Sequence, residues 1–391
     1  MKTALSFALW FLMTSVQTLA ADGLLLDLIV PPGEKDRFEH AEFTLWIDDA
    51  AKPIKAVIIH QHGCTNASPD KHPPITSDWH WRALARKHDA ALLVPMYHVT
   101  GNCADWNDPE SGSERAVFTA LEDFSRQSGR AELKDAPWLL WGHSGGSSWS
   151  AQMIVRHPGR VLAASFRGGC HKQFGDPVFR SLFTPVALNV PLLFVWGKRE
   201  SVPTSSHYVS WEPMNTMFCE LRTQGGKVCR VIDPRSEHGC DDSRLMSLSF
   251  FDAVLSGDAR GMDSNDASMP WMPNPTFAKR WQEFLETGTL RPIEPKLSAP
   301  ELSTTRDATG KTQLTWRIIP EISGGLRALR IYRDGKIWKE LGLKPGDFLA
   351  TSADSAPEIL RGEGTSDHSP GPHTYSITFL DAAGNESPHS K

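Results

Sequence analysis

Apolar residues gather in short unbroken runs along the first part of the chain, a pattern typical of strands that are buried on both faces of a parallel sheet. Six such runs are present: Val57–Ile59, Ala91–Val94, Trp138–Trp141, Val161–Phe166, Leu192–Trp196 and Val228–Ile232. Two helical stretches lie between them, the amphipathic Trp79–Lys87 and a helix opened by the capping box Ser111–Glu114. Alternating strands and helices predict an α/β fold with right-handed crossovers, in which ligands bind at the carboxyl ends of the strands.

The pattern changes near residue 290. Residues 291–300 carry three prolines, which suits a short stiff linker. Beyond them, apolar and polar residues alternate in three stretches: 313–318, 326–333 and 375–379. Asp334-Gly335 is a hairpin turn between two of these stretches. We therefore predict a small antiparallel sandwich over 301–391.

Three aromatic positions give this last region a family likeness. Trp316 lies on an early strand, Tyr332 lies in LRIYRDG, and Tyr375 opens YSITFLDAAGNES. In these features the region resembles a fibronectin type III domain. The resemblance implies a spacer or docking module without chemistry of its own.

The first twenty residues are typical of an export signal. Lys2 supplies a positive start, Ala4–Val16 is apolar, and Thr18-Leu19-Ala20 places small residues where a signal peptidase cuts. We predict a signal peptide over 1–20 and a secreted or periplasmic protein, with a retained anchor as the alternative. No later stretch predicts a membrane span, so no membrane contact is expected after cleavage.

Composition narrows the classes of function. In 391 residues, 41 basic side chains face 46 acidic ones, and the net charge of −5 leaves no basic footprint for nucleic acid. The chain is 40% apolar and 22% charged, which excludes both a disordered tail and a bundle of membrane helices. Residues 21–290 are long enough to form one large catalytic domain.

A glycine-rich motif follows the apolar run Trp138–Trp141 directly. It reads Gly142-His143-Ser144-Gly145-Gly146 and precedes a helical stretch. A serine on so sharp a turn between strand and helix needs small neighbours, so the motif predicts a nucleophile elbow with Ser144 as the nucleophile. The alternative is a glycine-rich turn with a solvated serine.

A serine hydroxyl needs a base, which in α/β hydrolases comes later in the chain. His238 fits, because it lies in the loop after Val228–Ile232. His171 is the rival, although its position after the strand next to the nucleophile suits the lining of a pocket better.

The third member of a triad is a carboxylate that orients the base. Glu200 is the acidic residue that follows the run Leu192–Trp196, in Gly197-Lys198-Arg199-Glu200. The alternative is that Glu200 pairs with a neighbouring cation and that Asp176, Asp241 or Asp242 serves instead.

Acyl transfer also needs donors for the developing oxyanion. One is expected from the backbone of Gly145, and the other from Cys64 or Thr65 in the loop after the first apolar run. His60 and His62 alternate like metal ligands, but no third ligand follows at short spacing. We therefore predict no metal and no cofactor.

These motifs together resemble a known family. The sequence resembles the polyhydroxybutyrate depolymerase and feruloyl or acetylxylan esterase group of α/β hydrolases. The motifs that carry the resemblance are HGCTN at 62–66, GHSGG at 142–146 and His238 in its late loop. The resemblance covers about 25–290 and implies ester hydrolysis through an acyl-enzyme. The chain departs from the group in having GKRES where an aspartate in G-D-x-D is usual, and H-S-G where L-S-A is common around the serine.

Aromatic residues near the expected cleft suggest a substrate. The candidates to bind a sugar ring or an aryl ester are Trp106, Trp149, Trp271 and His171. The alternative is that most of these rings are packed in the protein core. The first interpretation is an esterase that removes acetyl or feruloyl groups from a polysaccharide. The alternatives are a polyester depolymerase, a peptidase, and a binding protein without catalysis on the same fold.

The six cysteines all precede residue 241, and export favours disulfides. Strand order predicts the pairs Cys64–Cys103, Cys219–Cys229 and Cys170–Cys240. The first pair follows strands that are neighbours in a hydrolase sheet, the second pins a helix to the sheet edge, and the third tethers the loop of the base. Buried free thiols are the alternative.

Overall fold

A computed structural model describes most of the chain. The described residues are 23–48, 52–64, 76, 79–101, 103–239, 243–257, 261, 266, 268–290, 299–317, 326–342, 365–381 and 386–390, with the backbone of 18–20. Residues 1–17 of the predicted signal peptide and 291–298 of the predicted linker lie outside the described residues.

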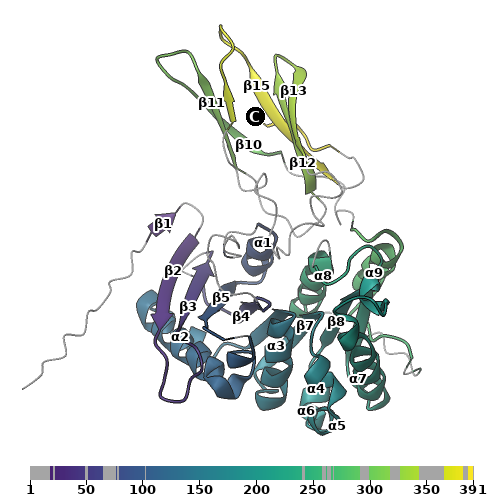
Figure 1. The fold of residues 1–391 in the computed structure, drawn as a ribbon. Coiled ribbons are helices and arrows are strands. Elements are labelled where there is room, and N and C mark those ends of the chain that lie inside the picture. The colour runs from purple at the N-terminus through teal and green to yellow at the C-terminus, as the bar shows by residue number, and fades with distance from the viewer. Residues whose placement is uncertain are drawn as a thin grey trace, which may run out of the picture.

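A nine-stranded sheet is the centre of the larger region (Figure 1). Its strands, in spatial order, are β1 (Thr18–Ala20), β2 (Gly23–Val30), β3 (His40–Ile47), β5 (Ala90–His98), β4 (Ala56–Gln61), β6 (Trp138–His143), β7 (Val161–Arg167), β8 (Leu192–Gly197) and β9 (Val228–Asp233). The strands from β5 to β9 are parallel, while β1, β2 and β3 pair antiparallel. All six predicted strands are confirmed, and the mostly parallel sheet is consistent with an α/β hydrolase.

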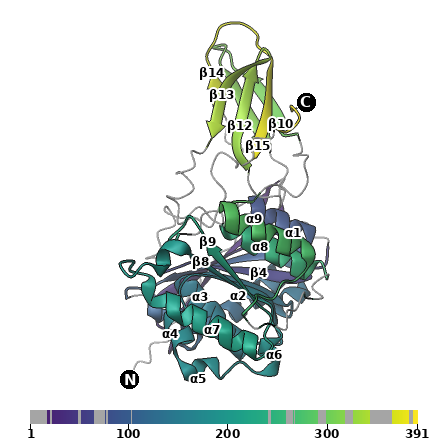
Figure 2. The same ribbon diagram turned by 90° about the vertical axis from the view of Figure 1, so that its right-hand side faces the viewer.

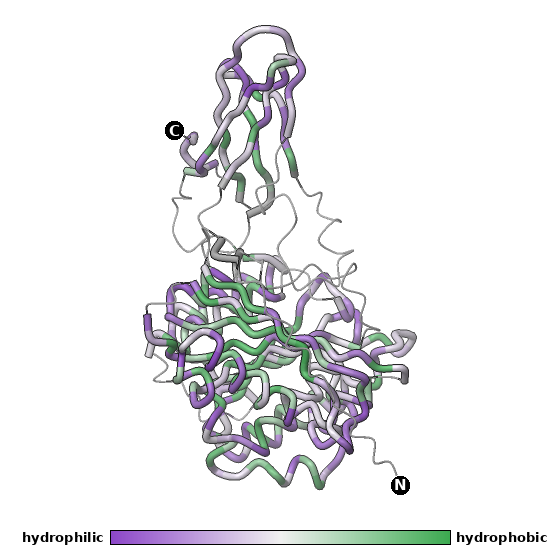
Figure 3. The backbone as a smooth tube through the Cα atoms, turned by 90° about the vertical axis from the view of Figure 1, so that its left-hand side faces the viewer, coloured by the Kyte–Doolittle hydropathy of each residue, from purple (hydrophilic) through white to green (hydrophobic). Residues whose placement is uncertain are grey.

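Helices cover both faces of this sheet (Figure 2). One face carries α2 (Ser113–Ser128), α3 (Gly145–Arg156) and α7 (Trp211–Thr223), and the other carries α1 (Trp79–Lys87), α8 (Ser243–Leu255) and α9 (Pro275–Thr287). Successive residues of a strand point to opposite faces, so Val57 and Ile59 enter one core and Ile58 the other. The parallel strands are therefore largely apolar, as the green colour through the middle of the sheet shows (Figure 3). No helix among the described residues is long and apolar enough to cross a membrane.

Two details of the larger region differ from the predictions. The predicted capping box at Ser111 does not form, because Ser111 ends a short 3₁₀ turn, Pro109–Ser111. The residue at the N-cap of α2 is instead Gly112, with φ 105°, and no side chain caps the helix. The strands β2 and β3 were not predicted. They pair antiparallel, and polar residues such as the exposed Asp27 and the half-buried Thr44 interrupt their apolar pattern.

The C-terminal region forms two three-stranded antiparallel sheets. Their orders are β10 (Glu301–Arg306), β11 (Thr312–Arg317), β14 (Thr365–Asp367), and β13 (Lys336–Gly342), β12 (Leu326–Arg333), β15 (Tyr375–Asp381). Trp316 of one sheet and Ile331 and Phe379 of the other belong to one buried cluster. The hairpin at Asp334 is confirmed, with φ 50° there and 74° at Gly335. The likeness to a fibronectin type III domain stays a prediction.

One disulfide joins the loops after β4 and β5. Cys64 and Cys103 are bonded with their Cα atoms 5.0 Å apart, so this predicted pair is confirmed. The pair Cys219–Cys229 is wrong, because Cys229 packs near Met272 in the core beneath α8 and α9, while α7 lies on the opposite face. Cys170 is a buried free thiol, and Cys240, its predicted partner, lies outside the described residues.

We expect the disulfide to contribute measurably to stability. Its cysteines are 39 residues apart, and closing a loop of that length restricts the unfolded chain by about 4 kcal/mol in the chain-entropy description. The double variant Cys64→Ser/Cys103→Ser should therefore unfold at lower urea concentration than wild type. Cys219→Ser, which changes an exposed thiol, is the control and should leave the midpoint unchanged. Equal midpoints for all three proteins would contradict the prediction.

Candidate active site

Ser144 occupies a strained turn between β6 and α3. Its backbone has φ 54° and ψ −111°, values that a residue with a side chain rarely adopts. The turn is held at both ends, because the N–H of Ser144 donates to the carbonyl of Arg167 (2.9 Å) and its own carbonyl accepts from Ser148 (3.2 Å). Such strain persists only where the surroundings enforce it, and it lies at the serine for which the sequence predicted a nucleophile elbow.

The predicted oxyanion loop lies directly against this turn. A side chain on Gly63 would come within 3.3 Å of the Cβ atom of Ser144, and one on Gly145 would overlap the Sγ atom of Cys64. The disulfide therefore packs on the residue that follows Ser144. Cys64 and Gly145, two of the predicted donors, are neighbours, while Thr65 lies outside the described residues.

His238 reaches the same place from the loop after β9. Gly168 and Gly169, just beyond β7, have φ 64° and 81°, and they pack between the two residues. A side chain on Gly168 would lie 2.8 Å from the ring of His238, and one on Gly169 would overlap the backbone of Ser144. The Nε2 atom of His238 is buried and has no hydrogen-bond partner among the described residues. This nitrogen is therefore available to take a proton from a nucleophile.

Glu200 lies behind His238, fully buried in the 3₁₀ turn Lys198–Ser201 that follows β8. Its Oε2 atom is 3.5 Å from Nδ1 of His238, a long contact of the kind that tightens when substrate binds. Its Oε1 atom accepts hydrogen bonds from Arg167 (2.8 Å) and from the N–H of Gly197 (3.1 Å). Burial alone would raise the pKa of Glu200, but the contact with His238 and the charge of Arg167 lower it to about 2. The carboxylate is therefore ionised and able to stabilise an imidazolium.

Arg167 is a functional residue that the sequence analysis missed. It ends β7 and is buried, with hydrogen bonds to Ser236 (3.0 Å), Ser243 (3.2 Å) and the carbonyls of Glu237 and Gly239 in addition to Glu200. Two of these acceptors flank His238 directly. Because each contact constrains the chain, Arg167 fixes both the acid and the loop that carries the base. The signal in the sequence was an arginine at the carboxyl end of an apolar strand.

Two more histidines contact the ring of His238. His207 stacks on it with ring centroids 3.7 Å apart and planes 4° from parallel, and His143 lies at 4.9 Å with its Nε2 atom 2.8 Å from the carbonyl of His238. Burial lowers the pKa of His238, the contact with Glu200 opposes this, and the charges of Arg167 and His207 lower it further. The pKa of His238 is lowered overall, which favours the neutral imidazole, the form that acts as a base.

The aromatic residues predicted to bind substrate do not face a cleft. Trp106 and Trp149 are completely buried and Trp271 is 2% exposed. Trp106 stacks on Tyr97, while the indole of Trp149 donates to Ser113 (3.0 Å). Buried rings cannot stack on a ligand, so the alternative of packed rings holds for all three. His171 begins the short helix α4 (His171–Gly175) and is exposed.

The alternating histidines His60, near the end of β4, and His62, just beyond it, also have packing roles. His60 is buried, stacked on Trp141 at 4.0 Å and edge-on to Trp81 at 5.0 Å. Burial lowers its pKa well below the ordinary value. His62 lies against Trp106 with ring centroids 4.9 Å apart. The aromatic contacts of both rings account for their placement.

Comparison with known proteins gives structural likeness alone. No protein-family description and no curated protein matches the sequence. Solved structures with a similar fold include an S-formylglutathione hydrolase from Agrobacterium tumefaciens, with a TM-score of 0.41 and 15% identity over 63% of this chain and 98% of that one. An acetyl xylan esterase from Aspergillus awamori has a TM-score of 0.35 and 11% identity over 50% and 79% of the two chains. An esterase from Pyrobaculum calidifontis has a TM-score of 0.38 and 13% identity over 60% and 85%.

The low pKa of Glu200 predicts how stability depends on pH. The folded-state pKa of about 2 is below the ordinary 4.5, so the ionised carboxylate stabilises the fold above about pH 4.5, and this contribution falls as the pH drops towards 2. Glu200→Gln should be less stable than wild type near neutral pH, and the gap should narrow by roughly 2 kcal/mol between about pH 7 and pH 3. Urea unfolding of both proteins measures the gap. A gap that stays constant would show that Glu200 titrates normally.

Proposed function

We propose that the protein is a serine ester hydrolase with Ser144, His238 and Glu200 as its triad. The observation that carries the proposal is the strained turn at Ser144, packed through Gly168 and Gly169 against a buried histidine whose Nε2 atom has no partner among the described residues. A strained backbone at a half-buried serine costs about 1–3 kcal/mol, and strain of this kind clusters at functional sites. This combination of nucleophile, base and ionised acid fits acyl transfer better than binding alone.

The mechanism follows from these positions. The Oγ atom of Ser144 attacks the ester carbonyl while Nε2 of His238 takes its proton, and Glu200 stabilises the imidazolium. The carbonyl oxygen gains negative charge, which the backbone N–H of Gly145 and a donor from Cys64 or Thr65 stabilise. The imidazolium then protonates the departing alcohol. Water, deprotonated by His238, attacks the acyl-enzyme and releases the acid.

The substrate proposal rests on the sequence resemblance. We infer removal of acetyl or feruloyl groups from a polysaccharide, outside the cytoplasm, with the C-terminal region as a fibronectin-like docking module. The disulfide at Cys64 supports an oxidising compartment. The buried tryptophans lend no support to a sugar-binding platform, so a polyester remains the alternative substrate. A panel of acetylated, feruloylated and polyester substrates separates the two.

The triad predicts a characteristic loss of activity. Ser144→Ala, His238→Ala and the double variant should each lose at least about a thousandfold in kcat on p-nitrophenyl acetate, and the double variant should be no worse than either single one, because nucleophile and base act as a unit. Cys219→Ser is the control and should retain full activity. Substantial activity in Ser144→Ala would overturn the proposal and favour a binding protein.

The stack of His207 on His238 predicts a shift in the pH profile. His207→Phe keeps an aromatic ring but removes a charge that lowers the pKa of His238, so the acid limb of kcat/KM should move to higher pH. His207→Ala should also lower kcat, because the ring that orients the base is gone. An acid limb that does not move in His207→Phe would show that His207 is not coupled to the base.

A further inference from the structure

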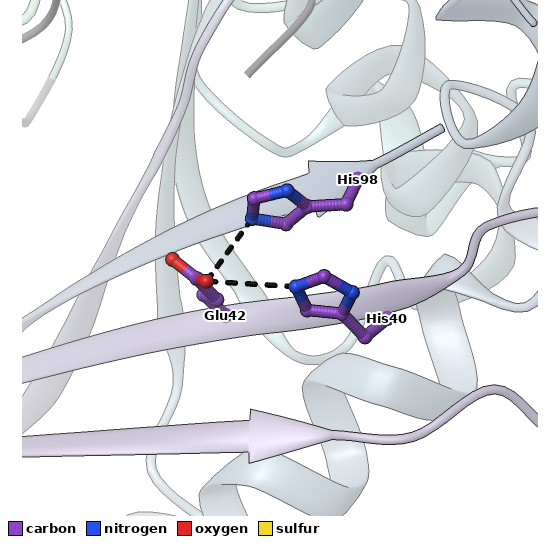
Figure 4. Close-up of side chains that lie close together, drawn as sticks. All are labelled: His40, Glu42 and His98. Carbon is purple, nitrogen blue, oxygen red and sulfur yellow. Dashed lines mark ion pairs between the residues drawn. The ribbon is translucent and has the colours of Figure 1, made fainter. Parts of the chain in front are cut away.

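A second cluster of titratable side chains lies on the sheet away from the triad. His40 and Glu42 are two residues apart on β3, so they point to the same face. His98 is the last residue of β5 and pairs directly opposite His40 in the antiparallel register. All three side chains therefore meet on the face that carries α1, α8 and α9, and Figure 4 shows both imidazoles directed at the carboxylate.

The two distances to Glu42 fit ligands around one small cation. The Nε2 atoms of His40 and His98 lie 3.5 and 3.2 Å from the same oxygen, Oε1 of Glu42, and all three atoms lie within 4.8 Å of one another. Two ligands bound to zinc at ~2.0–2.1 Å in tetrahedral geometry are about 3.3 Å apart. A charge-assisted hydrogen bond would instead be ~2.7–2.9 Å long. The two contacts are closer to the ligand spacing.

Among the described residues, these side chains have no other ionic partner. No lysine or arginine of the described chain pairs with Glu42, and Nε2 of His98 is buried without a hydrogen bond of good geometry. Exposed fractions of 34% for His40, 41% for Glu42 and 20% for His98 leave one side open to solvent. A bound ion would satisfy the buried nitrogen and keep a position for water.

We propose that His40, Glu42 and His98 form a binding site for a divalent transition-metal ion of the zinc class. Two neutral imidazoles and one carboxylate are a ligand set that zinc takes in proteins, with water in the remaining position. A metal ion lies in the plane of each imidazole that binds it. The two rings, now stacked with centroids 4.0 Å apart and planes 13° from parallel, therefore tilt on binding.

The position of the site indicates what the ion does. It joins β3 to β5, and the loop after β5 leads to Cys103, which is bonded to Cys64 beside Gly145. The ion would thus anchor the strand from which the disulfide reaches the predicted oxyanion loop. The site shares no residue with the triad, so the proposal stands or falls independently of ester hydrolysis.

Direct binding tests the proposal. Metal-free full-length protein is titrated with Zn²⁺ by calorimetry, and with Co²⁺ while visible absorption reports coordination by protein ligands. The variants are Glu42→Gln and His98→Gln. His157→Gln is the matched control, because His157 also contacts a carboxylate, Glu114, but has no second histidine there. Each titration is repeated in a His238→Ala background, which removes zinc held by the predicted catalytic base.

We expect one equivalent of Zn²⁺ in wild type, His157→Gln and the His238→Ala background. Affinity should fall at least about tenfold in Glu42→Gln and His98→Gln, together with the cobalt bands. Circular dichroism of the metal-free proteins checks that they fold. Glu42→Gln preserves the shape and size of the side chain, so it still tests the site if His98→Gln does not fold. No saturable binding by wild type, or equal affinity in wild type and Glu42→Gln, would overturn the proposal.

Discussion

The buried guanidinium of Arg167 is the interaction on which the geometry of the site depends. A charge removed from water is tolerated only when it is paired and its donors are satisfied. Here the partners are Glu200 after β8, two serines, and two carbonyls of the loop after β9. The segments that follow β7, β8 and β9 at the carboxyl edge of the sheet must therefore adopt conformations that satisfy the same guanidinium. The turn at Ser144 joins the same arrangement, since its N–H donates to the carbonyl of Arg167.

One carboxylate consequently serves two cations. Glu200 uses Oε1 for Arg167, which is always charged, and Oε2 for His238, which becomes charged only when it accepts a proton. The contact with His238 and the charge of Arg167 together keep the carboxylate ionised, and the charge of Arg167 also lowers the pKa of the histidine. The carboxyl group is therefore ionised while the imidazole in contact with it is neutral. A glutamate, one methylene longer than the usual aspartate, has the reach to contact both.

The sequence located the larger elements of the fold because they are governed by local chemistry. Strands buried on both faces must be apolar, and a serine turn before a helix must have small neighbours, so β6 and Ser144 could be found from residue types alone. Glu200 and His238 followed from their places after two such strands. Partners set by packing could not be found in this way. They depend on which side of the sheet a residue occupies. Examples are the orientation of Cys229 away from α7, the burial of Trp149 and the contacts of Arg167.

The backbone of Ser144 limits how far this protein can be made more stable. Its positive φ is tolerated by glycine at little cost, so Ser144→Gly would relieve strain while removing the hydroxyl. In the proposed hydrolase, stability and activity therefore compete at this position. Selection for thermal resistance alone would favour loss of the proposed nucleophile, and engineering for heat tolerance has to look elsewhere in the chain.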